Sequence, residues 1–567
     1  MWFGSLVPME KTRFGIARRH SQASFRPIRF RQRNTLIYLL LGISAIIYLC
    51  STPSAVETDN QEVNQHTQVQ EQWIARTDLD DSIQKLISNA PGEILLRDLL
   101  RPVEGNGNER LREMGLRVRA FKAIFEAWED VHLAHEPDGS TFVRDDVIQY
   151  LRGTTKSVNS TDEDLAESSL GSTLRAYEQY RSFLAKFTEL LFPWFHPYYP
   201  DLLALKSSFS KGGRGIVLTA GDGQAPFLLT TIPSFRKLGC TLPIEIMYLG
   251  ESDLSEDYRA ELEAMPGVIT RDIAQMVKDD GWRLAGWASK PFAILLSSFR
   301  EVIFIDADSA FFQNPEVLLD DPGYQKTGAL FFMDRNVMPE SKKHWLQEIL
   351  PKPFSRNVRL SRMWTGESGH QQESGVIVVD KWKHFVALLL VTRMNGPDRD
   401  GDKSKELKGI YEMVHGDKET FWLGWELVGD WAYTFHPGRI GVMGVLEESK
   451  QADPEHAEVQ KPHELMKFRN STEKYTMCAP QLLHLDVNGG LLWFNGWILT
   501  DKFGSKNYSK FQDYMIEPRE TREPPAYAIR DANVFCMTSA EKHELKSRDT
   551  KILDELIERA KEVNKEK

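Results

Sequence analysis

The chain has 567 residues, 41% hydrophobic and 27% charged, which is the composition of a soluble globular protein large enough for more than one domain. Its net charge of -11 is uneven: eight Lys or Arg and one Glu precede residue 35, so the rest of the chain carries about -18. This acidic body excludes nucleic acid as the main partner, because phosphate binding needs a basic surface.

The segment Thr35–Cys50 (TLIYLLLGISAIIYLC) contains no charge, and as a helix it would span ~24 Å. Four arginines between residues 26 and 33 precede it, so the positive-inside rule places residues 1–34 in the cytosol as a basic tail and all later residues across the membrane. We therefore expect residues 35–50 to be a transmembrane signal anchor suited to a thin bilayer. A cleaved signal peptide is the alternative, although the leader is long and Pro53 disfavours cleavage near Ala55.

Sequons and cysteines fit a secretory lumen. Asn159, Asn470 and Asn507 each begin an N-x-S/T triplet and are candidate glycosylation sites, although such triplets also arise by chance. Three cysteines on the far side of the membrane allow one disulfide and leave one thiol over: Cys240, Cys478 and Cys536. Their spacing does not decide the pairing.

Residues 51–88 are polar without a sustained period, which predicts a flexible stem. A helical region is expected over residues 89–208. Its first helix starts near Asn108 and carries one apolar stripe, which we expect in the core: Leu111, Met114, Val118, Phe121, Phe125 and Trp128. A second helix is expected from Asp162 to Phe192.

From residue 209 to 538, short apolar strands alternate with helical segments. Strands are expected at 215–223, 243–250, 301–306, 328–334 and 374–380, and helices at 227–239, 255–265 and 290–299. Continuous apolar strands with helical crossovers predict an α/β domain with a mainly parallel sheet covered on both faces. Residues 539–567 are charged and predict a surface helix.

Two aspartates end the strand EVIFID. Asp306 and Asp308 are two positions apart, so in an extended chain both carboxylates point the same way. Ligands of open parallel sheets bind at the carboxyl ends of strands, and divalent cations that bridge phosphates prefer oxygen ligands. The pair therefore predicts an ion clamp for a phosphorylated substrate. Other spaced acids in the chain follow no apolar strand and indicate solvated loops or a helix start.

Several blocks in this order resemble the fungal α-mannosyltransferases of the Mnn1 type. They are GIVLTAGDG, LPIEIMYLG, KPFAILLSSFREVIFIDADSAFFQNP, GALFFMDR, QQESGVIVVDKWKH, YEMVHGDKETFWLGWEL and QLLHLDVNGG, spread between Lys211 and Trp497. The resemblance implies a Golgi type II membrane protein with a GT-A fold. It further implies retaining transfer of mannose from GDP-mannose to mannose-terminated glycans of glycoproteins, with Mn²⁺ as cofactor and a Golgi transferase complex as a further partner. An α-1,3 linkage is expected, with α-1,2 left open.

The same resemblance implies roles for individual residues. The donor-binding residues expected from it are Ala220, Gly221, Asp222, Lys290, Asp306 and Asp308. The metal ligands expected from it are Asp306, Asp308 and His484. The charged residues expected around the mannose, as catalytic groups, are Glu373, Asp417, Lys418 and Glu419.

Plainer interpretations stay open for these residues. Lys290 could be a solvated lysine at a helix start, His484 a structural core residue, and any charge near the mannose an ordinary surface group. Related families carry a lysine after the glycine pair, where this chain has Leu491 and Leu492, so no phosphate contact is expected from that loop.

Two other functions remain compatible with the sequence. A UDP-sugar-dependent transferase would share the fold and the metal site, because those residues touch phosphate rather than base or sugar. A lumenal mannan-binding or assembly protein on a degenerate transferase domain is the non-enzymatic alternative, against which the joint presence of Asp306, Asp308, Asp417 and His484 argues. Neither the acceptor glycan, N- or O-linked, nor the oligomeric state follows from the sequence.

Overall fold

The computed structural model describes residues 79 to 565, except residues 80, 136–140, 145–146, 148–162, 196–197, 448–474, 502–506, 520–525 and 531–532. They belong to one compact unit, Ala75–Lys567. The predicted basic tail, the anchor Thr35–Cys50, most of the stem, and Asn159 and Asn470 lie outside the described residues. None of the helices described combines the length and the apolar composition needed to span a bilayer.

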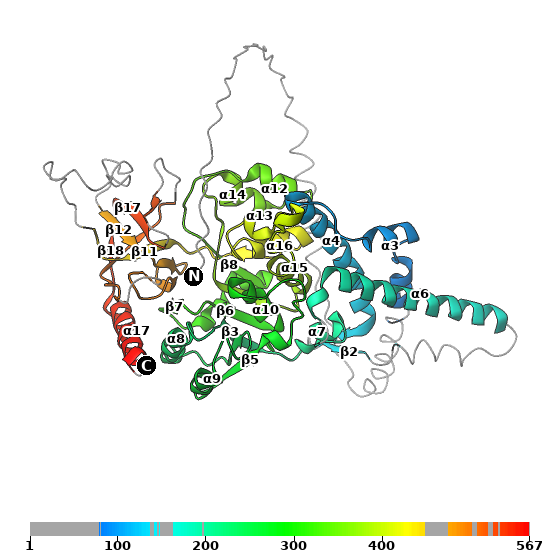
Figure 1. Ribbon diagram of the computed structural model, residues 1–567, viewed down its shortest axis with the longest axis horizontal. Helices are drawn as coiled ribbons and strands as arrows, with labels where there is room; N and C mark the ends of the chain where they lie inside the picture. The colour runs from blue at the N-terminus through cyan, green and yellow to red at the C-terminus, as the bar shows by residue number, and fades with distance from the viewer. Residues whose placement is uncertain are drawn as a thin grey trace, which may run out of the picture. The chain divides into compact units, whose positions relative to one another are not determined.

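A seven-stranded sheet forms the centre of this unit (Figure 1). The strands lie in the order β10-β8-β9-β6-β3-β4-β5. They are β3 (Arg214–Thr219), β4 (Ile244–Tyr248), β5 (Val268–Asp272), β6 (Glu301–Ile305), β8 (Ala329–Met333), β9 (Gln372–Asp380) and β10 (Thr434–Phe435). Neighbours are parallel except that β9 runs antiparallel to both β6 and β8. The predicted α/β class is confirmed, and the sheet is mixed because of β9.

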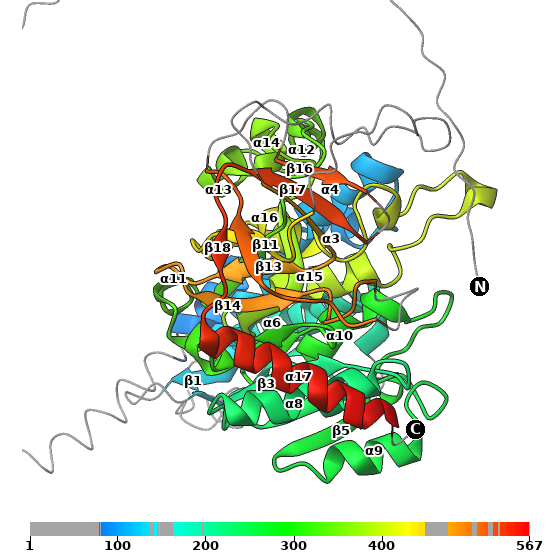
Figure 2. The ribbon, with the colours of Figure 1, turned by 90° about the vertical axis from the view of Figure 1, so that its left-hand side faces the viewer.

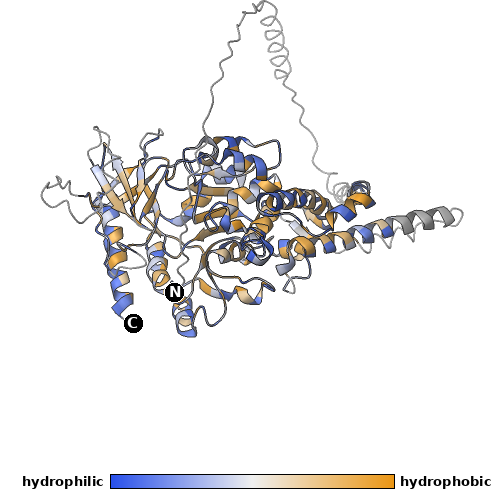
Figure 3. Ribbon diagram, turned by 45° about the horizontal axis from the view of Figure 1, so that its top comes forward, coloured by the Kyte–Doolittle hydropathy of each residue, from blue (hydrophilic) through white to orange (hydrophobic). Residues whose placement is uncertain are grey.

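Helices cover both faces of the sheet, as predicted. Along β6, Val302 and Phe304 enter one core and Ile303 and Ile305 the other, because successive side chains of a strand face opposite sides. Helices α10 (Ser289–Leu296), α15 (Phe385–Asn395) and α16 (Thr420–Val428) contribute to the first core, and α8 (Ala225–Lys237), α9 (Glu256–Glu263) and α11 (Pro322–Thr327) to the second. Figure 3 shows the central strands as strongly hydrophobic.

The N-terminal helices extend the first core. They are α3 (Glu93–Leu99), α4 (Gly107–His132), α6 (Glu163–Leu191) and α7 (Leu202–Ser208). The predicted stripe of α4 is buried throughout, and Gly115 lets the backbone of α4 approach α16 so closely that a Cβ there would lie 2.7 Å from a methyl carbon of Leu427. A short hairpin of β1 (Leu133–His135) and β2 (Thr141–Val143) follows α4 and was not predicted.

A second, antiparallel sheet packs beside the first. Its order is β18-β15-β11-β13-β14-β7, formed by β7 (Ala310–Phe311), β11 (Ile440–Gly444), β13 (Leu482–Leu485), β14 (Leu491–Asn495), β15 (Asp513–Ile516) and β18 (His543–Glu544). The predicted C-terminal helix is α17 (Ser547–Lys565), which buries Leu553, Leu556 and Ala560 against this sheet. Figure 2 shows α17 lying along α8. Between β8 and β9 the chain forms α12 (Lys343–Ile349), α13 (Arg356–Leu360) and α14 (Arg362–Thr365).

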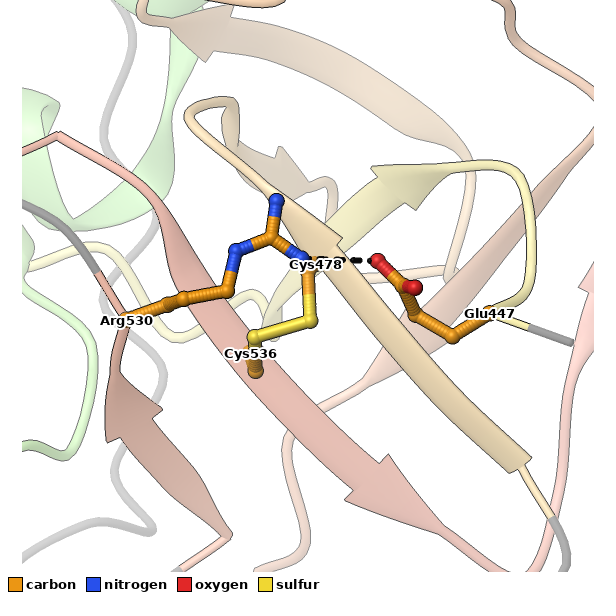
Figure 4. Close-up of a disulfide and its surroundings, with 4 residues drawn as sticks. All are labelled: Glu447, Cys478, Arg530 and Cys536. Carbon is orange, nitrogen blue, oxygen red and sulfur yellow. Dashed lines mark hydrogen bonds and ion pairs between the residues drawn. A yellow bond between two sulfur atoms is a disulfide. The ribbon is translucent and has the colours of Figure 1, made fainter. Parts of the chain in front are cut away.

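A disulfide joins two strands of a third sheet, which has the order β12-β17-β16. Its strands are β12 (Tyr475–Ala479), β16 (Tyr527–Ile529) and β17 (Phe535–Ser539). Cys478 and Cys536 are directly opposite each other and bonded, and the ion pair of Arg530 with Glu447 lies beside them (Figure 4). Cys240 is the buried free thiol. One disulfide with one cysteine left over is therefore confirmed.

Replacing Cys478 with serine is expected to lower the free energy of unfolding by about 4 kcal/mol, because the bond closes a loop of 58 residues in the unfolded chain. Chemical denaturation of each variant under oxidising conditions measures the loss. Cys536→Ser should give the same loss, and the double variant no more than either single one. Additive losses would show that the two cysteines stabilise the protein separately.

Candidate active site

Acidic side chains from three strands meet at one edge of the central sheet. Asp306 follows β6 and Asp334 follows β8, so both lie at carboxyl ends of parallel strands. Because β9 runs the opposite way between them, its first residues lie at the same edge, and they include Glu373. The backbone N–H of Asp306 donates to the carbonyl of Gly375, 2.8 Å away, which fixes β6 and β9 in this register.

Lys290 lies between two carboxylates, those of Asp306 and Asp417. It lies in the first turn of α10, and its side chain is only 6% exposed. Its Nζ donates to Asp306 Oδ2 at 2.8 Å and to Ser374 Oγ at 3.2 Å, and it lies 3.3 Å from Asp417 Oδ2. The alternative of a solvated lysine is therefore wrong, and Lys290 belongs to the site.

Lys418 lies between two other carboxylates, those of Asp334 and Glu373. Its Nζ donates to Asp334 Oδ2 at 2.7 Å and to Glu373 Oε2 at 2.6 Å. The other oxygen of Glu373 accepts from Asn495 Nδ2 at 2.6 Å and from the N–H of Gly375 at 3.0 Å. Lys418 is thus held between two buried carboxylates and is not an ordinary surface charge.

Lys290 and Lys418 differ in how far their positive charge offsets the negative charge of the carboxylates around them. Burial acts to raise the pKa of Asp334 and Glu373, but Lys418 holds the pKa of both below the ordinary value. Burial raises the pKa of Asp306 to about 7, and the charges of Asp308 and Asp417 also raise it, against the opposing effect of Lys290. Asp306 and Asp417 share the single ammonium of Lys290, so their combined negative charge exceeds the positive charge beside them, and a further cation would relieve it.

This charge balance tests whether a divalent cation fits the site. Asp306 and Asp308 are both partly exposed, and the peptide N–H of Trp497 fixes the carbonyl of Asp308 at 2.9 Å. Within the described residues, no three His, Cys, Asp or Glu side chains come close enough together to hold a metal ion. A cation here would take oxygen ligands from Asp306 and Asp308 and would need further oxygens from a bound phosphate, an arrangement that such cations use.

The predicted metal ligand His484 is a buried residue of the second sheet. It lies on β13 opposite Trp493, which in turn pairs with Phe311, and the rings of His484 and Trp493 stack with centroids 4.1 Å apart. Burial lowers the pKa of His484 to about 3, so the imidazole is neutral at pH 7. His484 Nε2 is buried and has no hydrogen-bond partner among the described residues, and the metal-ligand role of His484 stays a prediction.

Both carboxylate oxygens of Glu419 accept hydrogen bonds from the protein. It is buried at the start of α16, where Oε1 accepts from the N–H of Gln371 at 2.9 Å and Oε2 from Trp422 Nε1 at 2.5 Å. Both oxygens thus bind protein donors that join α16 to β9. These contacts give Glu419 a structural role, and its role at the mannose stays a prediction; Glu373 and Lys418, by contrast, are in direct contact.

The turn Ala220–Asp222 lies beside a pocket of about 300 Å³. Gly221 packs so closely on Asp253 that a Cβ would come within 2.6 Å of Asp253 Oδ1. Asp253 lines the pocket with residues that follow β4 and β5 and with residues 283–286 before α10. Asp222 is exposed and accepts from the N–H of Ser255 at 2.7 Å, so it fixes the loop next to the pocket.

Sequence reasoning missed three polar residues of the site: Asp334, Arg335 and Asn495. Arg335 follows Asp334 and lies over the ring of Phe535, 3.9 Å from its centroid, next to the disulfide. Asp334 follows an apolar strand just as Asp306 does, and that signal could have identified it. Asn507, a predicted glycosylation site, is exposed.

Comparison with known proteins finds similar mannosyltransferases over the part of the chain that contains the candidate site. Residues 213–486 match the family described as "Mannosyltransferase putative". "Probable alpha-1,3-mannosyltransferase MNT4" of Saccharomyces cerevisiae is 28% identical over 54% of this chain and 53% of its own length. "Alpha-1,3-mannosyltransferase MNT2" of the same yeast is 26% identical over 56% of this chain and 59% of its own. The chain thus spans about half the length of these relatives.

Among solved structures, the Mn/GDP form of core-mannan synthase A (CmsA/Ktr4) from Aspergillus fumigatus is 11% identical. It covers 39% of this chain and 72% of its own, with a TM-score of 0.26.

Proposed function

We infer that this chain, whose resemblance to the fungal Mnn1-type mannosyltransferases is confirmed by its relatives, is a retaining α-mannosyltransferase. It would transfer mannose from GDP-mannose to mannose-terminated glycans of glycoproteins in an α-1,3 linkage. The observation that carries this proposal is the sheet edge where Asp306, Asp308, Glu373 and Asp417 meet. It lies within the segment that matches the mannosyltransferase family.

The donor would lie along this edge in the manner of a GT-A enzyme. The pocket beside Gly221 suits the base and ribose, since ligands of such sheets bind outside the carboxyl ends of the strands. Asp306 and Asp308 would hold a divalent ion such as Mn²⁺ together with the diphosphate. Bound there, the ion would supply a positive charge that stabilises the departing GDP.

The remaining groups act on the sugar. Departure of the nucleotide leaves positive charge on the anomeric carbon, and the buried carboxylates of Glu373 and Asp417 can stabilise it because they act in a site of low dielectric. Lys290 and Lys418 hold these carboxylates in place through ion pairs. A fixed geometry of this kind places donor and acceptor for reaction without further reorganisation.

The cellular setting is part of the same proposal. The arginines before Thr35–Cys50 support a single-pass type II Golgi membrane protein with its catalytic part in the lumen. The disulfide of Cys478 with Cys536 supports an oxidising compartment.

Calorimetric titration of the full chain in detergent with GDP and with UDP, each with Mn²⁺, tests the donor. GDP should bind at least about tenfold more tightly, a difference of ~1.4 kcal/mol. Tighter binding of UDP would contradict the mannose assignment and favour a UDP-sugar-dependent transferase. A chelator should weaken GDP binding, since two carboxylates alone repel a diphosphate.

A further inference from the structure

Three aromatic rings form a row on the surface beside the active site. Trp287 is 58% exposed, an unusual state for so large an apolar side chain. Its ring centroid lies 6.2 Å from that of His415, which is also exposed, and the ring of His415 lies 5.8 Å from that of His370. We call Trp287, His415 and His370 the aromatic row.

Both ends of the aromatic row lie next to residues of the candidate active site. Trp287 comes three residues before Lys290, and its ring packs on the backbone of Gly416, which directly precedes Asp417. A Cβ at Gly416 would lie 3.0 Å from Trp287 Cε3, and the positive φ of +61° there also favours glycine. The tryptophan is thus fixed next to the site by backbone contact.

The other end of the row reaches the second lysine cluster. His370 Nδ1 is buried and has no hydrogen-bond partner among the described residues, although it lies 3.8 Å from Glu419 Oε1. Lys418 and Asp334 are among the charged groups that act on His370. The row therefore combines an exposed apolar ring with an imidazole nitrogen whose nearest acidic partner, Glu419 Oε1, is 3.8 Å away and beyond hydrogen-bond distance.

These features suit a sugar ring. A pyranose has an apolar C–H face that can pack on an indole, and hydroxyls at its edge that can bond imidazole nitrogens. Trp287 does not line the pocket beside Gly221, whereas residues 283–286 directly before it do. Trp287 therefore directly follows the lining of that pocket without being part of it.

We propose that Trp287 and His415 form the acceptor subsite, the surface on which the accepting pyranose of a mannoside lies, with His370 at its inner end. This proposal rests on the proposed function, since it assigns the second substrate of the same reaction. Under this proposal, Trp287 contacts the acceptor and does not contribute to the binding of the donor.

The test compares Trp287→Ala, Trp287→Phe and unmodified full-length protein with GDP-mannose, Mn²⁺ and α-1,2-mannobiose. Trp287→Ala should raise the KM for mannobiose about tenfold or more, because the apolar face of the sugar loses its contact. Hydrolysis of GDP-mannose without acceptor, and the affinity for GDP, should stay within about twofold. Trp287→Phe should restore most of the affinity for mannobiose.

Trp431→Ala is the matched control, since Trp431 is 46% exposed and outside the site, and it should leave the KM unchanged. An unchanged KM for mannobiose in Trp287→Ala would overturn the proposal. So would an equal loss of GDP affinity or of GDP-mannose hydrolysis, which would place the ring on the donor side or in the fold. An unmodified protein that hydrolyses GDP-mannose but transfers to no mannoside would refute the acceptor class, whereas one that binds no GDP would refute the proposed function itself.

Discussion

Asp308→Asn is expected to lower the rate of mannose transfer from GDP-mannose at least about 10³-fold, equivalent to ~4 kcal/mol of transition-state stabilisation. Asp308 is a partly exposed carboxylate beside Asp306, and its charge contributes to the raised pKa of that group. Its replacement by an uncharged amide weakens the cation clamp on the diphosphate without adding volume. Initial rates of product formation at saturating GDP-mannose measure the effect.

A second acidic pair in the chain provides the control. Asp400 is exposed and two residues from Asp398, so it has the same spacing as Asp308 but follows no strand of the sheet. Asp400→Asn should leave the rate within about twofold, as for a surface charge. A rate for Asp308→Asn equal to that of the control would mean that Asp308 has no part in the reaction. The melting temperature of both variants should match that of the unmodified protein.

Lys418→Met is expected to lower the free energy of unfolding by about 3–5 kcal/mol, because it leaves Asp334 and Glu373 buried without their shared cation. Denaturant unfolding measures the loss. Adding Glu373→Gln should recover part of it, since one of the two uncompensated charges is then removed. Transfer activity should fall together with stability.

Lys383→Met is the matched control, because Lys383 is 49% exposed and lies 3.7 Å from Asp380. Its loss should be below about 1 kcal/mol. The difference between unmodified protein and Lys418→Met should be largest at neutral pH and should shrink as the pH falls. The folded pKa of Asp334 and Glu373 is lowered by Lys418, so that stabilisation is present above their ordinary pKa and is lost in acid. A loss that is small or independent of pH would contradict the clamp.

Hydrophobic pattern predicted most of the fold because it reports burial directly. The stripe from Leu111 to Trp128 and the run Val302–Ile305 are buried where predicted. The direction of β9 could not be predicted, since an apolar strand covered on both faces has the same pattern whether it is parallel or antiparallel. That direction shapes the site, because it brings Glu373 to the same sheet edge as Asp306.

Individual side chains were harder to place from the sequence. The spacing of Asp306 and Asp308 after an apolar strand pointed to the sheet edge at which Lys290 and Glu373 also lie. The surroundings of His484 and Glu419 could not be predicted, because they depend on strand register and on hydrogen bonds across the fold, such as the one from the indole of Trp422 to Glu419. The sequence could not predict the burial of Lys418 either, because its two partners, Asp334 and Glu373, are remote from it in the sequence.

The most direct test of mannose transfer from GDP-mannose is to incubate the full chain with GDP-mannose, Mn²⁺ and α-1,2-mannobiose. The product is then analysed by nuclear magnetic resonance. We predict a trisaccharide with a new α-1,3-linked mannose, formed with GDP-mannose and abolished by a chelator or by Asp308→Asn. Transfer that persists in Asp308→Asn, or that proceeds from a UDP-sugar and not from GDP-mannose, would contradict it.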